Sequence, residues 1–240
     1  MIIMMGTLLE KKAPANLPET EANIYEELQK SDLPHYYRSW QSLNFELLLR
    51  RNIIESAKEL AKSGAEFTVF YNSKFNEQFW TKTYRGYRLK PFAKPSEAIE
   101  DIFKNGKKYG FECSTAIVII YYYAVLKSIN PSAFNQLFQN LLVWDWSYDE
   151  DLRIITKVGT EFIPGDVLYF HNPDFLHPVW IGENAVYLGR NQYFGHGIGI
   201  RTKEEMIKAL NTLRKPNAKK SAYLLSQYSR LDFDYLSRFA

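Results

Sequence analysis

The chain has a single cysteine, Cys113, at a position that suits nucleophilic chemistry. It follows Tyr109-Gly110-Phe111-Glu112 and precedes a long uncharged run, which predicts that it lies in the first turn of a helix. Unpaired backbone N–H groups and the helix dipole favour a thiolate there, and the thiolate is the nucleophilic form. Glu112 opposes this effect, because an adjacent carboxylate raises a thiol pKa unless it points away. The alternative for Cys113 is a small buried apolar residue.

Two further residues could complete a catalytic group with this cysteine. His196 lies between Gly195 and Gly197, so its ring is uncrowded and another backbone can approach it. Glu183 lies 13 residues earlier, a separation that suits two neighbouring strands of a hairpin. A carboxylate facing the imidazole across the ladder would orient the ring and stabilise a Cys⁻/His⁺ pair. The alternatives are a structural histidine and an exposed acid at a strand end.

The other histidines carry no comparable pattern. His35 lies in a polar, proline-containing segment, and His171 and His177 lie in a loop with Asn172 and Pro173. One cysteine and four histidines without paired short spacings do not fit a structural zinc site. We therefore predict no metal site and no cofactor.

The elements that must position these residues follow from hydrophobic periodicity and from glycine and proline positions. Apolar residues recur at three- and four-residue spacing over residues 40–63, ahead of Gly64 as a helix cap. The uncharged run over 113–126 is too long for a strand and predicts a buried helix, although its residue types favour a strand. Further predicted helices span residues 21–30, 95–104 (with Ser96 as its cap), 132–140 and 202–213, and predicted strands span residues 67–71, 84–89, 167–170, 184–188 and 194–200.

Length and composition place the chain among globular proteins. The 240 residues include 46% hydrophobic and 24% charged residues, which suits one α+β domain over 1–240, with residues 10–36 as an irregular arm. The net charge of +3 is too small to indicate nucleic-acid binding. A lone cysteine suits a reducing compartment, and we expect neither a signal peptide nor a membrane span.

The chain is also rich in aromatic residues. It has 38 of them, namely 5 Trp, 17 Tyr and 16 Phe, which is typical of a ring-rich core, an aromatic cleft or an adhesive surface.

Several long motifs together resemble one known family. They include the segments 109–122 (YGFECSTAIVIIYY), 180–189 (WIGENAVYLG), 193–200 and 221–232 (SAYLLSQYSRLD), and they span most of the chain. The sequence resembles the small protein-glutamine γ-glutamyltransferases, or transglutaminases, of Bacillus-type spores. The resemblance implies a single-domain papain-like or NlpC/P60-like α+β core, with its nucleophile at the start of a buried helix packed on an antiparallel sheet. It assigns Cys113 as nucleophile, His196 as base and Glu183 as acid, and it matches Glu112 to a family glutamate that would be a second acid.

The resemblance also implies an activity and a setting. Such an enzyme forms ε-(γ-glutamyl)lysine bonds through a cysteine thioester, releases ammonia and needs no calcium. The expected partners are spore-coat proteins as glutamine donors and lysine acceptors, and the expected location is the mother-cell cytoplasm and then the spore coat. We expect a monomer. Two other classes stay open, a cysteine peptidase or amidase of the NlpC/P60 type and a non-catalytic aromatic-rich coat protein.

A thioester that favours lysine over water must be sheltered, because water is far more concentrated. Trp180 lies three residues before Glu183, and Trp144 and Trp146 share one face if their segment is a strand. We hypothesise that Trp180, Trp146 and Phe67 wall a channel over the nucleophile, which accepts the lysine stem and cation. The alternative is that these rings belong to the core.

Overall fold

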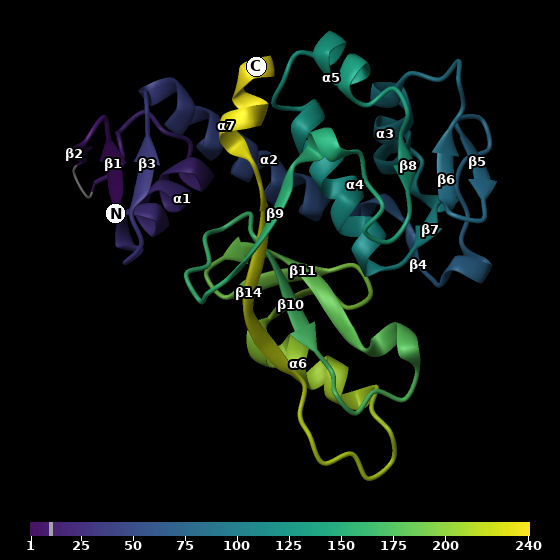
Figure 1. Cartoon of the computed structure of the whole chain (residues 1–240). Helices are drawn as coiled ribbons and strands as arrows, with labels where there is room; N and C mark the ends of the chain where they lie inside the picture. The colour runs from purple at the N-terminus through teal and green to yellow at the C-terminus, as the bar shows by residue number, and fades with distance from the viewer. Residues whose placement is uncertain (10–11) are drawn as a thin grey trace.

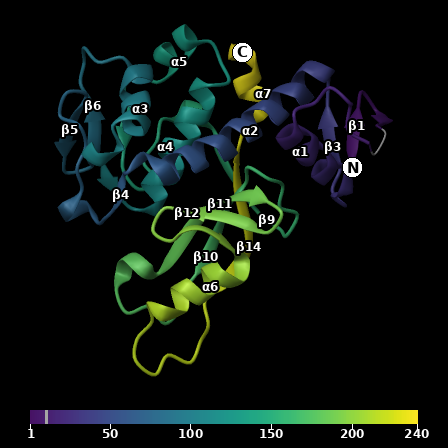
Figure 2. The ribbon, with the colours of Figure 1, turned by 180° about the vertical axis from the view of Figure 1, so that it is seen from behind.

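The computed structural model describes residues 1–9 and 12–240, and these form a mixed α+β fold (Figure 1). Helices α2 and α4 lie above the largest sheet, and α6 lies against that sheet on its other side (Figures 1 and 2). The helices are α1 (Glu19–Lys30), α2 (Trp40–Ser63), α3 (Pro95–Lys104), α4 (Cys113–Leu126), α5 (Pro131–Leu137), α6 (Lys203–Thr212) and α7 (Phe233–Leu236). Within the described ranges, none of these helices has the length and apolar character needed to cross a membrane.

The largest sheet has six antiparallel strands in the order β13-β12-β11-β10-β14-β9. Its strands are β9 (Ile154–Val158), β10 (Val167–His171), β11 (Gly182–Gly189), β12 (Gln192–Gly195), β13 (Gly199–Thr202) and β14 (Tyr223–Leu231). Three small sheets accompany it, with the orders β2-β1-β3, β4-β7 and β5-β6-β8. Their strands are β1 (Ile2–Met4), β2 (Thr7–Leu8), β3 (His35–Tyr37), β4 (Glu66–Phe67), β5 (Trp80–Thr83), β6 (Gly86–Leu89), β7 (Gly110–Phe111) and β8 (Leu142–Val143).

Helix α4 is the buried centre of the molecule. Every one of its residues except Tyr123 is buried, and the helix packs between α2 and β11. A helix that is apolar all round needs cover on every side, which explains its central position. The predicted buried helix over 113–126 is confirmed, and it starts at Cys113.

Helix α2 provides the long support on which α4 and the sheet rest. Ser39 and Ser42 form a capping box at its start, and Gly64 ends it with a φ of 84°. Its Leu49 and Ile53 are fully buried in the main core. The bounds predicted from periodicity, 40–63, are those of the structure.

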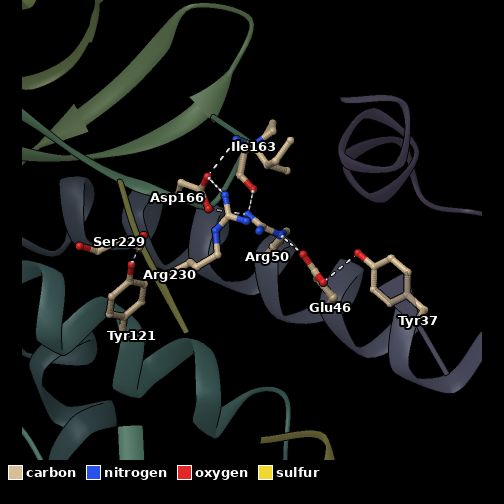
Figure 3. A network of polar contacts seen from close by, with 9 residues as sticks. Tyr37, Glu46, Arg50, Tyr121, Ile163, Asp166, Ser229 and Arg230 are labelled. Carbon is tan, nitrogen blue, oxygen red and sulfur yellow. Dashed lines mark hydrogen bonds and ion pairs between the residues drawn. The ribbon is translucent and has the colours of Figure 1, made fainter. Parts of the chain in front are cut away.

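A buried ionic network joins α2 to the sheet (Figure 3). Arg50 on α2 donates to Glu46 at 2.8 Å and to Asp166 at 2.9 Å, and Arg230 on β14 donates to Asp166 at 2.6 Å. The Tyr37 hydroxyl on β3 donates to the other carboxylate oxygen of Glu46, Oε2, at 2.9 Å. Because Asp166 immediately precedes β10, this network fixes the sheet against the helical layer.

The amino-terminal segment is more regular than the expected irregular arm over 10–36. Helix α1 buries Ile24 and Leu28 in an apolar cluster with Ile2 on β1 and Leu43 on α2. Pro18 stands at the N-cap of α1, so this proline precedes a helix and does not interrupt one. Residues 10 and 11 of the expected arm lie outside the described residues.

Three local predictions were wrong. The predicted strand 67–71 ends at Phe67, and a 3-10 turn follows at Phe70–Asn72. Ser96 does not cap α3, because Lys94 is its N-cap residue and Pro95 its first residue. The predicted strand 194–200 is two strands, β12 and β13, with a turn over 196–198 between them. Alternating apolar residues do not reveal a chain reversal that glycines permit.

Candidate active site

Cys113 is the first residue of α4 and faces an open cavity. The thiol residue is 9% exposed and borders a cavity of about 870 Å³. Glu112 is the N-cap residue, and its carboxylate accepts a hydrogen bond from the Thr115 backbone N–H at 3.0 Å. The Glu112 side chain is therefore turned toward the helix end and lines the same cavity.

Aromatic rings and neutral polar groups make up much of the cavity wall. Its aromatic residues are Phe70, Trp144, Trp146, Tyr148, Tyr169 and Tyr228. Glu112 and Asp145 are its only acids, and no lysine, arginine or histidine is among its described lining residues. Any negative charge that develops at Cys113 must therefore be stabilised by neutral hydrogen-bond donors.

The Cys113 thiol is neutral at ordinary pH. Burial raises the pKa of the thiol above its usual range, and the charges of Glu183 and Glu112 raise it further, while hydrogen bonds from Asn184 offset part of the effect. The expected thiolate at the helix start is therefore not the resting form. Burial and two nearby acids outweigh the helix dipole, so the thiol needs a base at the moment of attack.

Glu183 is a fully buried acid on β11 that reaches the His196 turn. Its Oε1 atom accepts a hydrogen bond from the Gly197 backbone N–H at 3.1 Å, and its Oε2 atom has no partner among the described residues. Burial raises the pKa of the Glu183 carboxyl to about 8, the charge of Glu112 adds to this, and backbone N–H groups of Gly197 and His196 lower it. A Cβ atom at Gly195 would lie 2.6 Å from the Glu183 side chain, so the glycine makes this approach possible.

The His196 ring is held by the backbone of other segments. Its Nε2 atom lies 3.2 Å from the carbonyl oxygen of Glu66, and the ring stacks on Phe111 with centroids 4.8 Å apart. Burial lowers the pKa of the imidazole to about 4, so it is neutral at pH 7. Across residues 1–9 and 12–240, no hydrogen bond joins this ring to the Cys113 thiol or the Glu183 carboxyl. The turn and the acid meet as the hairpin spacing predicts, but the contact is through the backbone of the turn.

Two of the three predicted channel rings lie together. Phe67 and Trp180 stack with centroids 4.7 Å apart and planes at 27°. A Cβ atom at Gly197 would lie 2.8 Å from Trp180 and 3.0 Å from Phe67, so the pair rests on the backbone of that turn. Both rings come from segments whose neighbouring residues line the cavity.

Trp146 lies apart from that pair, on the cavity wall itself, and is 37% exposed. Residues 144–147 form a tight turn, in which Asp145 has a φ of 54°, so the suggested strand with Trp144 and Trp146 on one face is wrong. Asp145 is held in this turn because its backbone N–H donates to the Thr115 hydroxyl at 2.7 Å. This tertiary contact reverses the chain within four residues.

The sequence reasoning missed one residue that contacts the nucleophile. Asn184 follows Glu183 on β11, and its Nδ2 atom lies 3.5 Å from the Cys113 Sγ atom. Strand alternation places Asn184 and Glu183 on opposite faces, and the face of Asn184 is the one that meets α4. Alternation was the available signal, but the sequence does not tell which face meets α4.

The whole chain matches a known family. A family model described as "Protein-glutamine gamma-glutamyltransferase" matches residues 1–240. A protein of that name from Bacillus pumilus (strain SAFR-032) is 44% identical over 241 residues, covering 98% of each chain. Another from Bacillus mycoides (strain KBAB4) is 49% identical over 208 residues, covering 85% of this chain and 75% of its own.

A solved structure shares the fold. It is described as "Transglutaminase from Geobacillus stearothermophilus (without C-terminal extension)" and superposes with a TM-score of 0.81 at 51% identity. The match covers 85% of this chain and 99% of the Geobacillus chain.

Proposed function

The chain belongs to the protein-glutamine γ-glutamyltransferase family, and from this premise we propose that Cys113 carries the acyl group and that Glu183 moves the proton. The enzyme is an acyltransferase that joins a protein glutamine to a lysine amine. One observation carries the residue assignment. Cys113 opens onto a cavity and is affected by the charge of a buried carboxyl, Glu183, which has one oxygen without a partner among the described residues.

The proposed reaction has two halves. The Cys113 Sγ atom attacks the γ-carboxamide carbon while the Glu183 carboxylate accepts the thiol proton. The C–N bond then breaks, Glu183 returns the proton to the leaving nitrogen, and ammonia departs from a thioester. A lysine amine next attacks the thioester carbon and loses a proton to Glu183, which passes it to the sulfur as the C–S bond breaks. Each half is an easier step than direct transfer.

Glu183 suits this task better than His196 in the structure. A base with a pKa of about 8 is well matched to neutral or mildly alkaline conditions, whereas an imidazole with a pKa near 4 is a weak base. Within residues 1–9 and 12–240, no hydrogen bond joins Glu183 to the thiol, and catalytic contacts often tighten only when substrate binds. For His196 to act as the base, the thiol would have to meet Nδ1, or the ring would have to leave the Glu66 carbonyl oxygen. We assign His196 to positioning of the turn and Glu112 to capping α4 and to adding negative charge at the site.

The substrates are assigned to two sides of the nucleophile. We propose that the aromatic cavity with Trp146 takes the glutamine donor, because Cys113 opens directly into it. We propose that the Phe67–Trp180 pair guides the lysine acceptor, since stacked rings offer an apolar wall to the lysine methylene stem and a ring face to its cation.

The core is proposed to be papain-like or NlpC/P60-like, supported by a cysteine at the start of a buried helix that packs on an antiparallel sheet.

The setting is also a proposal. We propose that the enzyme is made in the mother cell, acts as a monomer without calcium and crosslinks spore-coat proteins. The support is the sequence resemblance and the Bacillus origin of the relatives. Isopeptide content of the coat, measured by mass spectrometry in strains with and without the gene, tests the setting. Equal crosslink content in the two strains would contradict it.

One assay separates the three function classes. A glutamine-donor peptide is mixed with a fluorescent amine, and incorporation and ammonia release are measured for wild type and Cys113→Ala. A transglutaminase incorporates the amine, an amidase only releases ammonia, and an adhesive coat protein does neither. We expect Cys113→Ala to lose both signals while its stability falls by about 1 kcal/mol or less. Activity retained by that variant would remove Cys113 as the nucleophile.

A further inference from the structure

Asn184 lies at the nucleophile with a polar group that the steps above do not use. Its side chain is 8% exposed, borders the cavity and places Nδ2 3.5 Å from the Cys113 Sγ atom. A thiol sulfur is only a weak hydrogen-bond acceptor, so this N–H bond is lost at little cost when a better acceptor arrives.

A better acceptor forms during the reaction. When sulfur bonds to the carboxamide carbon, the carbonyl oxygen becomes an oxyanion next to Sγ. The site is poor in positive charge, because the described lining of the cavity has no basic residue and the acids Glu112 and Glu183 act on the same sulfur. Neutral N–H donors must therefore stabilise this oxygen.

A second donor belongs to the nucleophilic residue itself. The backbone N–H of Cys113 is in the first turn of α4, where helical N–H groups have no partner within the helix. The neighbouring Thr115 N–H is already used by the Glu112 carboxylate, whereas no described residue accepts from the Cys113 N–H. The helix dipole also favours negative charge at this end.

We propose that Asn184 Nδ2 and the Cys113 backbone N–H together form the oxyanion hole, which makes Asn184 a catalytic residue. This inference rests on the proposed role of Cys113. It also gives a physical reason for the order Glu183-Asn184 on β11. Strand alternation sends the acid toward the His196 turn and the amide toward the sulfur.

The test compares two reactions of the same thiol. Acylation by a glutamine-donor peptide forms an oxyanion, whereas alkylation by iodoacetamide needs only the thiolate. In Asn184→Leu, which keeps the side-chain size, we expect single-turnover acylation to fall about 100- to 1,000-fold with KM little changed. Alkylation should fall by less than about tenfold, because only the hydrogen bond that helps to stabilise the thiolate is lost. Asn184→Ala is measured in parallel in case the leucine disturbs folding.

A matched control makes the same substitution outside the cavity. Asn44 on α2 is exposed and is not among the described residues that line the cavity, and we expect Asn44→Leu to change the acylation rate by less than about threefold. Equal losses in acylation and alkylation, or wild-type acylation by both Asn184 variants, would overturn the oxyanion assignment. Wild-type enzyme that forms no acyl-enzyme at Cys113 would instead overturn the proposed nucleophile, so the two failures are distinguishable.

Discussion

The His196 Nε2 atom lies 3.2 Å from the Glu66 backbone carbonyl oxygen, 130 residues away in the chain. This contact, with the stack on the Phe111 ring, holds the imidazole against β4 and β7. The acid predicted to orient the ring, Glu183, accepts a hydrogen bond from the backbone of the turn, and its other oxygen has no partner among the described residues. The proton transfers are therefore assigned to the carboxyl, which changes the expected order of mutational effects.

We predict that Glu183→Gln is more damaging than His196→Gln. The roles implied by the sequence resemblance, His196 as base and Glu183 as acid, predict the reverse order. A general base contributes about 10²- to 10⁴-fold, so Glu183→Gln should lower kcat/KM by about 100-fold or more. His196→Gln, which keeps a hydrogen-bond donor for Glu66, should lose less than about tenfold. Steady-state amine incorporation measures both, and a larger loss in the histidine variant would restore the imidazole as base.

The pH dependence of acylation follows from the pKa of the base. Because Glu183 must be ionised to accept the thiol proton, kcat/KM should rise with pH and level off above about 8. In Glu183→Gln this inflection should disappear, and the residual rate should depend on the ionisation of the Cys113 thiol alone. An inflection near pH 4 in the wild type, matching His196, would speak against this assignment.

The free energy of unfolding should fall as pH rises, in contrast to kcat/KM. Burial raises the pKa of Glu183 from 4.5 to about 8, so between these values the folded state binds more protons than the unfolded state. The free energy of unfolding should therefore fall as pH rises through this window, by up to about 1.4 kcal/mol per pH unit from this group. Glu183→Gln should remove that contribution and be more stable than wild type at pH 8. Urea titrations of both proteins at pH 5 and pH 8 measure the free energy of unfolding. An equal change with pH in the two proteins would contradict the predicted contribution of Glu183.

Trp180→Ala tests the acceptor path. If the Phe67–Trp180 pair guides lysine, amine incorporation should fall more than ammonia release, and the product ratio should shift toward hydrolysis. Trp146→Ala is the matched control on the cavity wall, where both rates should fall together because donor binding is weakened. An unchanged ratio in Trp180→Ala would mean that this ring supports the fold only.

Asp166 is assigned to stability and not to the active site. Its carboxylate is fully buried and pairs with both Arg50 and Arg230. Asp166→Asn removes the negative charge that two buried guanidinium groups share, and it should lower the free energy of unfolding by about 3–5 kcal/mol. Glu97→Gln, which breaks the exposed pair with Lys94, should cost nothing measurable by the same thermal unfolding experiment. Equal stability of Asp166→Asn and wild type would contradict the structural role.

Local sequence patterns were sufficient to predict the scaffold of the site. The uncharged run that begins at Cys113 defined a buried helix and placed the cysteine in its first turn, because no other element can bury so long an apolar stretch. Periodicity defined α2 to the residue, and the glycines around His196 marked a place where another side chain approaches closely. Each of these features depends on residues near one another in the chain.

Which groups meet at the site depends on how distant segments pack in the folded chain. Alternation placed Glu183 and Asn184 on opposite faces of a strand, but only the packing of α4 on β11 showed that the amide contacts the sulfur. The partner of the His196 ring lies on β4, far away in the chain. The charge state of Cys113 likewise depends on burial and on acids from two segments. Local patterns report backbone preference and burial, whereas contacts and pKa values arise from segments that only folding brings together.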